Sequence, residues 1–345
     1  MGVNLSPLLE GLKNEKEIGY FARKTIAFDA YNTLYQFLAS IRQPDGTPLK
    51  DFDGNITSHL SGLFYRSIKM MSKGIKLVFV FDGKPPKFKY ETIEERKKKK
   101  EEAEALLQKA KDMEEVSYME MYAKQTIRLT KDMVKESKEL LSAMGIAYVQ
   151  APSEGEAEAA HLAANGSVDA SASQDYDSLL FGSPKLVRNL SVSERRKLPR
   201  RNEYITVKPE EIILTDVLKS LSISKEQLVM IGLLIGNDFN KGVKGVGPKT
   251  ALKIVKEYKE LEEMLTFTSN KYDHEFEPYI RDVYEFFLNP PVVDANVEEG
   301  EMDEEKVLEL LVEKHDFSRE RIEHGIENIK KIKEEERQHS IKEWF

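Results

Sequence analysis

Six acidic residues of this sequence stand where an apolar run ends or where a helix is expected to begin: Asp29, Asp82, Glu154, Glu156, Asp175 and Asp177. Taken singly, such a residue most simply caps a helix or turn, because its side chain accepts hydrogen bonds from free backbone N–H groups. By that interpretation, one of Asp175 and Asp177 is a cap and the other has no specific role. By the same interpretation, Glu156 forms a capping box with Ser153.

The joint pattern indicates different chemistry. If the fold gathers the six carboxylates at one place, they repel one another and resist ionisation unless cations neutralise them. Carboxylate oxygens suit Mg²⁺ or Mn²⁺, and two such ions about 4 Å apart commonly activate water and stabilise the leaving oxygen in phosphodiester hydrolysis. The six residues therefore predict a two-metal site.

The elements that must position these residues can be read from the same segments. The runs at 25–30 and 76–83 are rich in β-branched and aromatic residues and too short for helices, so they predict buried parallel strands, with a helix over 56–73 between them. A helix over 152–166 leads to a further strand over 167–177. This order predicts an α/β fold, in which a central, mostly parallel sheet has helices on both faces and binds ligands at the carboxyl ends of its strands.

A glycine-rich segment follows another apolar run, which ends at Asp238. In "GVGPKTA", Gly245 and Gly247 allow the backbone to approach a phosphate, and Pro248 suits the first position of the next helix. The free N–H groups at that helix start, with Lys249 and Thr250, favour an anion. The segment predicts a helix-hairpin-helix that grips a DNA backbone without reading sequence. The alternative is a tight turn between two helices.

Composition limits the class of protein. The 345 residues contain no cysteine, which excludes disulfides and thiol chemistry, and no apolar run is long enough for a membrane span, so we expect a cytoplasmic protein. The net charge of −8 is unusual for a nucleic-acid binder. However, residues 84–100 carry eight basic against three acidic residues, and residues 188–201 carry six against one. Each patch alone is most simply solvated surface.

Several segments together resemble the flap endonucleases of the structure-specific 5′ nuclease superfamily: "FDA", "FDGKPP", "APSEGEAEAA", "SQDYD", "GNDF", "GVGPKTA" and "QHSIKEWF". The resemblance covers nearly the whole chain. It implies that two Mg²⁺ ions, with Mn²⁺ as a substitute, are held by seven acids, namely the six above and Asp238. Gln174 stands where many relatives carry an acid, but that position is not a ligand.

The resemblance also implies DNA contacts. Lys89 and Arg96, seven residues apart and so on one helix face, lie at the base of a helical arch over 84–130 and act on the scissile phosphate. Gly2 lies beside the active site, and Tyr35 packs near the base at the scissile position, although ordinary core packing explains Tyr35 almost as well. Residues near Phe317 and Thr57 match a pocket for a one-nucleotide 3′ flap only loosely.

The expected organisation is a nuclease domain over 1–330 and a flexible tail over 331–345. The domain includes the helix-hairpin-helix region at 225–265 and C-terminal helices at 266–330, where Ile322, Ile326, Ile329 and Ile332 form one helical stripe. The tail resembles the motif by which archaeal relatives dock on a sliding clamp, through Gln338, Ile341, Trp344 and Phe345. The alternative is that these apolar residues fold back on the body.

We therefore expect a monomeric, metal-dependent endonuclease, with 5′-3′ exonuclease activity, that removes 5′ flaps in DNA replication and repair. Two other functions are possible. A haloacid-dehalogenase-type phosphatase needs a second Asp where Tyr31 stands. A non-catalytic module that binds DNA structures and the clamp would be expected to lack at least one of the seven acids, and none is missing.

Overall fold

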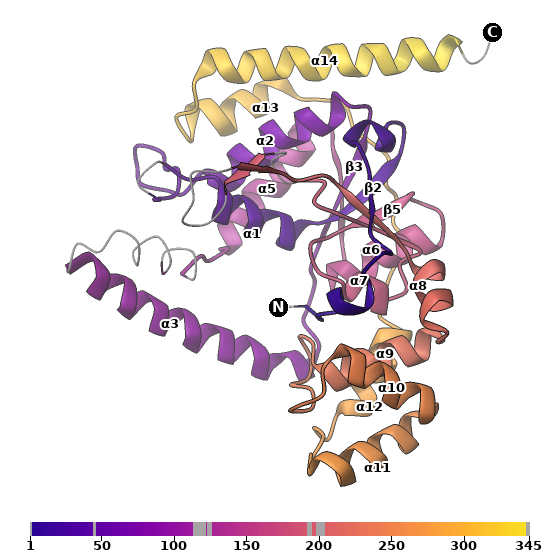
Figure 1. The fold of residues 1–345 in the computed structure, drawn as a ribbon. Helices are drawn as coiled ribbons and strands as arrows, with labels where there is room; N and C mark the ends of the chain where they lie inside the picture. The colour runs from indigo at the N-terminus through magenta and orange to yellow at the C-terminus, as the bar shows by residue number, and fades with distance from the viewer. Residues whose placement is uncertain are drawn as a thin grey trace.

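A computed structural model describes residues 2–43, 46–112, 122, 126–191, 195–197 and 204–342, with side chains described except at 111–112, 195–197, 204–205 and 336–342. Figure 1 shows a central sheet, a group of helices beyond one end of it, a long helix that projects away from the body, and another long helix near the C-terminus. None of the described helices is long and apolar enough to cross a membrane.

The central sheet has seven strands. In spatial order they are β1 (Asn14–Glu15), β9 (Glu210–Ile213), β6 (Lys185–Arg188), β5 (Ala170–Ala172), β2 (Thr25–Asp29), β3 (Lys76–Phe81) and β4 (Ala147–Gln150). The five strands from β6 to β4 are parallel, whereas β9 and β1 pair antiparallel at the far edge. The mostly parallel sheet and its two predicted central strands are confirmed.

Alternation along β2 explains why both faces of the sheet are covered. Ile26 and Phe28 belong to a core that includes residues of α1 (Ala30–Ser40), α2 (Ser58–Met71) and α5 (Lys131–Ala143). Ala27, between them, belongs to a second core with α6 (Gly155–Ala164). Successive strand side chains point to opposite faces, so the continuous apolar run of β2 serves two helical layers, as predicted.

A separate group of helices packs against the sheet edge and the N-terminal segment. It comprises η1 (Ser6–Leu8), α7 (Asp177–Leu180), α8 (Leu214–Leu221), α9 (Lys225–Ile235), α10 (Pro248–Glu257), α11 (Leu261–Tyr272) and α12 (Ile280–Leu288). Val3 and Leu5 share one buried core with these helices. The segment from Val3 to Leu9 is therefore fixed within the body.

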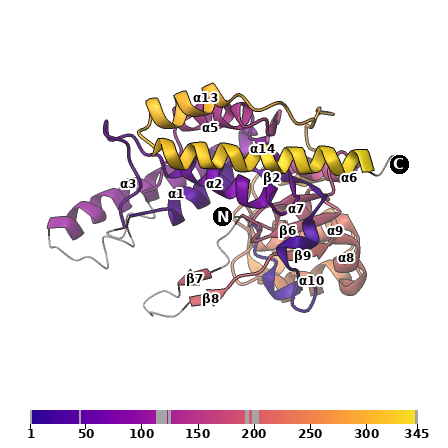
Figure 2. The ribbon, with the colours of Figure 1, turned by 90° about the horizontal axis from the view of Figure 1, so that it is seen from above.

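The segment expected to form an arch begins with η3 (Lys87–Lys89) and continues as α3 (Tyr90–Asp112). Figure 1 shows α3 running from the α9–α10 group outward, past α1. Residues 113–121 and 123–125, also in the expected arch, lie outside the described part of the chain. Figure 2 shows a second projection, the antiparallel pair β7 (Arg195–Lys197) and β8 (Tyr204–Thr206).

The chain continues through α13 (Glu304–Leu308) and η4 (Glu309–Glu313) to α14 (Arg319–Lys342). Ile322, Ile326 and Ile329 are buried in the core shared with α2, and Ile332 packs against it, which confirms the predicted stripe. The helix includes Gln338 and Ile341, whose side chains are not among those described, and Trp344 and Phe345 lie outside the described residues.

A buried charged cluster ties this C-terminal region to the body. His315 lies 2.9 Å from Asp51 Oδ2 through Nδ1 and 3.2 Å from Glu136 Oε1 through Nε2. Glu136, on α5, also pairs with Lys314 at 2.8 Å and lies 3.8 Å from His59 of α2. The neighbouring His59 side chain, opposed by burial and aided by Lys314, lowers the pKa of Glu136 to about 2. This carboxylate is thus ionised whenever the chain is folded near neutral pH.

Replacing Glu136 should make the chain less stable and less sensitive to acid. A carboxylate whose pKa is lowered by folding stabilises the fold above its ordinary value of about 4.5, and this contribution is lost as pH falls toward 2. We expect Glu136→Gln to lower the free energy of unfolding at pH 7 and to flatten its decline between pH 4.5 and 2, measured by urea denaturation. Glu139→Gln, on the exposed face of α5, is the control. Equal pH slopes for both variants would contradict this account.

Candidate functional site

Four of the predicted acids lie at the carboxyl edge of β2 and β3 and at the start of α6. Asp29 ends β2 and accepts a hydrogen bond from the Asn32 N–H at 3.0 Å, so it does cap α1. Asp82 follows β3 and accepts from the Gly155 N–H at 2.7 Å, which ties this strand end to the first turn of α6. Glu154 occupies the N-cap position of α6 but makes no cap hydrogen bond with its side chain.

Glu156 is held by hydroxyl groups from another segment. Its Oε1 accepts hydrogen bonds from Ser173 Oγ and from Ser178 Oγ. The capping box with Ser153 is wrong, because α6 begins at Gly155 and its N-cap is Glu154. The Glu156 side chain is therefore directed to the segment that carries Asp175 and Asp177.

Asp175 and Asp177 do not cap α7. Asp175 Oδ2 accepts a hydrogen bond from Asn32 Nδ2 at 3.0 Å, and Asp177 Oδ1 accepts one from the Val3 N–H at 2.7 Å. The N-cap of α7 is Tyr176, which makes no side-chain cap bond. Both carboxylates are thus bound by groups far away in sequence, so the interpretation as one cap and one bystander is wrong.

Gly2 lies directly against these two carboxylates. A Cβ atom on Gly2 would lie 2.7 Å from Asp175 Cβ and 2.8 Å from Asp177 Oδ2, closer than real Cβ contacts. Only glycine fits here without displacing a carboxylate. The structure therefore places Gly2 beside the carboxylates.

Asp238 reaches the cluster from the helical group. It follows α9, and its Oδ1 accepts a hydrogen bond from Arg96 of α3 at 2.5 Å. Burial is the largest single influence on the Asp238 pKa and opposes ionisation, but the nearby positive charges, Arg96 first and Lys89 among the others, together keep this pKa below its usual value. Asp238 thus joins the hairpin region to the base of α3.

The other six carboxylates have raised pKa values, and burial is the largest cause in each. Repulsion adds to it: Asp82 raises the pKa of Asp29, and Asp177 raises the pKa of Glu156. Burial and then the charge of Asp238 raise the pKa of Asp177 to about 7. Burial also raises the pKa of Glu154 to about 7, although Lys89 opposes it. The seven acids therefore lie close enough to repel one another.

Two cations offset part of this charge. Lys89 Nζ forms an ion pair with Glu154, and it lies 5.5 Å from the centre of the Phe239 ring. Arg96 forms its pair with Asp238, and its side chain is 41% exposed. Phe88 packs against Phe239 and so anchors η3 beside the cluster. Lys89 ends η3 and Arg96 lies near the start of α3, and both side chains turn toward the carboxylates.

The donor set fits divalent cations that retain water. Within the part of the chain that the structure describes, no three acidic or histidine side chains already converge on one point at ligand distance. Mg²⁺ commonly keeps several waters and takes only one or two carboxylates directly. A wide, buried acidic cluster with no cysteine or histidine ligand matches that preference better than it matches a closed zinc site.

The predicted hairpin lies between α9 and α10. Gly245 adopts φ +86°, which favours glycine, and a Cβ atom on either Gly245 or Gly247 would meet open space. Val243 and Val246 are buried and anchor the turn. Pro248 begins α10, Gly247 is its N-cap, and no side chain caps this end. Lys249 is exposed beside it and Thr250 is half-buried.

Tyr35 is not an ordinary core residue. Its side chain, on α1, is 38% exposed, and Lys100 Nζ of α3 lies 5.2 Å from the ring centre. A partly exposed aromatic ring between α1 and α3 suits contact with a base.

The two segments that carry the loosely matched residues Thr57 and Phe317 are joined by a hydrogen bond. Thr57 is buried and Phe317 is half-buried, and the backbone N–H of Phe52 donates to Asp316 Oδ2 at 2.9 Å. Phe52 itself is almost fully exposed. The loop before α2 is thus attached to the turn before α14.

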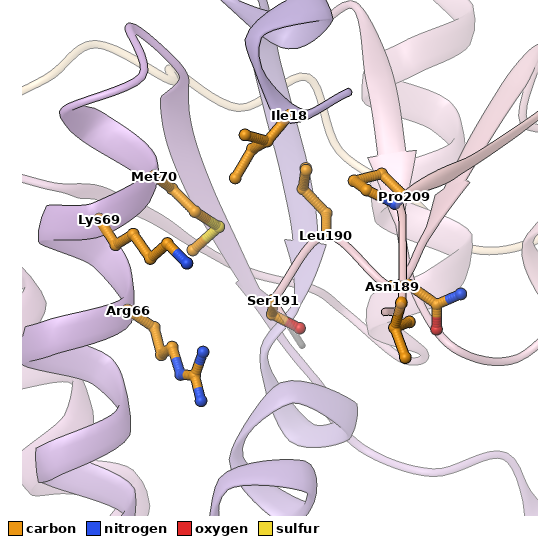
Figure 3. A pocket seen from close by; sticks show the side chains of 9 residues that line it. Ile18, Arg66, Lys69, Met70, Asn189, Leu190, Ser191 and Pro209 are labelled. Atoms are coloured by element: carbon orange, nitrogen blue, oxygen red, sulfur yellow. The ribbon is translucent and has the colours of Figure 1, made fainter. Parts of the chain in front are cut away.

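A hollow beside α2 is separate from the predicted site residues. Figure 3 shows Lys69, Met70 and Arg66 of α2 facing Leu190 and Ser191 across it. None of its lining residues is a predicted site residue. The hollow is therefore distinct from the carboxylate cluster.

Sequence reasoning missed three residues that hold the carboxylates: Asn32, Ser173 and Arg188. Asn32 stands three positions after Asp29, in the first turn of a helix, where a polar side chain can face the same site. Arg188 was counted only as part of a basic patch, but it donates to the Gln174 carbonyl at 3.1 Å. Ser173 had no signal beyond lying next to the "QDYD" segment.

Comparisons with known proteins agree with this geometry. Residues 1–103 match the XPG N-terminal domain and residues 145–238 match the XPG I-region, and these ranges include all seven acids. The chain is 51% identical over 352 residues to Flap endonuclease 1 of Aeropyrum pernix, covering 100% of both chains. It is 53% identical over 335 residues to Flap endonuclease 1 of Hyperthermus butylicus, covering 96% of this chain and 95% of that protein.

A solved structure is similar over nearly the full length. Flap endonuclease-1 from Methanococcus jannaschii matches with a TM-score of 0.74 at 36% sequence identity, covering 96% of this chain and 98% of the other. The predicted α/β architecture is thereby confirmed.

Divalent ions should stabilise this chain more as pH rises. Acids whose pKa is raised by folding, such as Glu154 and Asp177, destabilise the ion-free chain as pH rises from about 4 through about 7. A bound cation removes that cost. We expect the difference in free energy of unfolding between MgCl₂ and chelator to grow from pH 5 to pH 8, measured by urea denaturation. Contributions from groups outside the site, such as the lowered pKa of buried His59, cancel in this difference.

Asp177→Asn should reduce the pH-dependent increase in the stabilisation by Mg²⁺. Asp169→Asn, at the opposite end of β5, is the matched control and should leave it unchanged. An equal gain from Mg²⁺ at pH 5 and pH 8 in the wild type would count against a buried site of raised pKa.

Proposed function

The chain belongs to the flap endonuclease family, and from this membership we propose that it cuts DNA at the junction between a 5′ single-stranded flap and duplex by hydrolysing a phosphodiester bond. The observation that carries the proposal is the cluster of seven carboxylates at the carboxyl edge of the sheet, together with the two basic side chains of Lys89 and Arg96. A phosphatase of the haloacid-dehalogenase type is not supported by the family. We further propose that the enzyme acts as a monomer in lagging-strand maturation and repair.

Family nucleases of this type depend on divalent metal ions. We propose Mg²⁺ as the ion, two per site, held by Asp29, Asp82, Glu154, Glu156, Asp175, Asp177 and Asp238, with Mn²⁺ as a substitute. Ions bound there would neutralise the phosphate, activate water and stabilise the leaving oxygen. The carboxylates themselves would orient the ions. Asp29, Glu154 and Asp177 are buried and the other four are half-buried, so the cluster is partly shielded from bulk water.

Lys89 and Arg96 are proposed to bind the scissile phosphate. In the chain alone each is paired with a carboxylate, so the cluster holds both close to where a phosphate diester must lie. Neutralisation of Glu154 and Asp238 by bound cations would release both side chains toward the phosphate. There they stabilise charge that develops on the phosphate oxygens in the transition state.

The remaining contacts orient DNA around this point. The uncapped start of α10, with Gly245, Gly247, Lys249 and Thr250, is proposed to bind the backbone of the duplex without reading its sequence. Tyr35 is proposed to contact the base next to the scissile bond. Gly2 lets the N-terminal segment pass closely beside Asp175 and Asp177.

The function is tested by comparing three substrates, each with Mg²⁺ and with chelator: a 5′-flap DNA, an intact duplex and a phosphate monoester. We expect Mg²⁺-dependent cutting at the flap junction alone. Asp177→Asn should slow cutting by about 10²-fold or more, because a ligand to the ions contributes several kcal/mol to the transition state, while junction binding is largely retained. Asp169→Asn is again the control. Monoester turnover without flap cutting would falsify the nuclease assignment.

We also propose that the C-terminal residues Gln338, Ile341, Trp344 and Phe345 dock on a sliding clamp. Their spacing supports this proposal, and Ile322, Ile326 and Ile329 already account for the buried face of α14 upstream. A docking segment at the chain end leaves the nuclease body free to bind DNA.

Deleting residues 338–345 should abolish clamp stimulation and leave basal flap cleavage unchanged, measured as cleavage rate with and without the clamp. The double variant Trp344→Ala with Phe345→Ala should behave in the same way, since these are the apolar anchors. Loss of basal cleavage to the same extent as stimulation would instead indicate that the tail folds back on the body.

A further inference from the structure

The loop between β5 and α7 is held at its backbone by two side chains from different elements. The Gln174 N–H donates to Asn32 Oδ1 at 3.4 Å, and the Gln174 carbonyl accepts from Arg188 Nε at 3.1 Å. Both backbone polar groups of Gln174 are therefore bound by side chains. This residue immediately precedes Asp175.

Arg188 is fixed by several contacts. Its Nη1 donates to Tyr176 Oη at 2.6 Å and to Glu210 Oε2 at 2.9 Å. Its guanidinium carbon lies 4.3 Å from the centre of the Tyr176 ring, within cation–π range. Arg188 ends β6 opposite Glu210 of β9 in the antiparallel register. The guanidinium thus connects the sheet edge to the residues on either side of Asp175.

Asn32 connects two of the acids. Its backbone N–H donates to Asp29 Oδ1 and its Nδ2 donates to Asp175 Oδ2, each at 3.0 Å. Asp29 ends β2, and Asp175 follows the neighbouring strand β5. Asn32 therefore fixes the spacing of carboxylates that come from two strands.

We propose that Asn32 and Arg188 are positioning residues that hold Asp175 and Asp177 at the separation from Asp29 that divalent ions require. The loop that carries Asp175 lies between β5 and α7, so no strand or helix hydrogen bonds fix its position. Because the carboxylates around it repel one another, side-chain contacts must hold it in place. Donors that orient ligating carboxylates commonly change metal affinity 10- to 100-fold when removed. The inference rests on the proposed function only in assigning the carboxylates to metal.

The test is Mn²⁺ binding without DNA, followed by the electron paramagnetic resonance signal of free Mn²⁺. Arg188→Lys keeps the charge but loses the planar fork, and Asn32→Ala removes both amide contacts. We expect each to weaken Mn²⁺ binding about 10-fold or more. The double variant should lose less than the product of the two effects, because both act on one loop. The control is Arg281→Lys. Arg281 pairs with Glu262 through two hydrogen bonds, at 2.6 and 2.7 Å, away from the loop, so this variant should bind Mn²⁺ as the wild type does.

A purely structural role is excluded by a second measurement. Flap cleavage by Arg188→Lys should need more Mn²⁺ for half-maximal rate yet approach the wild-type rate at saturation, since the ligands themselves remain. Thermal unfolding in chelator checks that each variant folds. Tyr176→Phe, which removes only the hydroxyl acceptor, is the milder variant if Arg188→Lys does not fold, and it should weaken Mn²⁺ binding in the same direction.

Unchanged Mn²⁺ affinity in folded Arg188→Lys, Asn32→Ala and Tyr176→Phe would overturn the proposal, whatever the enzyme cuts. Conversely, if the wild type binds Mn²⁺ but leaves flap DNA intact, the proposed function fails while weakened binding in the variants still supports the positioning role.

Discussion

Mutual repulsion among buried carboxylates is the constraint that organises this molecule. A carboxylate removed from water is costly to ionise, and each neighbour of like charge raises that cost. Most of the acids accept a hydrogen bond from a distant part of the chain. The donors are the N–H groups of Val3 and Gly155, the Asn32 side-chain amide and the hydroxyls of Ser173 and Ser178. The N-terminal segment, α1, α6 and the loop after β5 are thereby drawn to one edge of the sheet.

The side chains of Lys89 and Arg96 extend this arrangement to the elements that are proposed to contact DNA. Lys89 and Arg96 lie at the start of the projecting segment, and each is held by a carboxylate of the cluster. Asp238 lies between α9 and α10, so its pair with Arg96 connects the projecting helix to the hairpin. The chain alone thus balances the charges of the two side chains that are proposed to bind phosphate. By this proposal, cations and DNA phosphate would rearrange the same set of charges, so the two binding events would be electrostatically linked.

The sequence was sufficient for features that depend on local periodicity. The apolar runs that end at Asp29 and Asp82 predicted the central strands, because a strand buried on both faces needs a continuous apolar run. The hairpin and the Ile322, Ile326 and Ile329 stripe followed from glycine spacing and helical period. The gathering of acids followed from the rule that parallel strands end at one edge.

What the sequence did not predict depends on contacts across long separations. Asp177 is bound by the Val3 N–H, 174 positions away, and Asp175 by Asn32, 143 positions away. No local pattern encodes such partners, which is why Asp175 and Asp177 also suited caps. Arg188 was counted only as positive charge, because its role depends on the pairing of β6 with β9. The place of Gly2 came from family resemblance, not from its own spacing.

The position of Gly2 has a consequence for the side chains that the carboxylate cluster tolerates. The backbone at Gly2 and Val3 passes directly beside Asp175 and Asp177, with no room for even one added carbon at Gly2. Any side chain introduced at Gly2 would have to displace one of the two carboxylates, and the neighbouring Val3 N–H that binds Asp177 would be disturbed with it. The arrangement of two acids thus depends on a residue that has no side chain of its own.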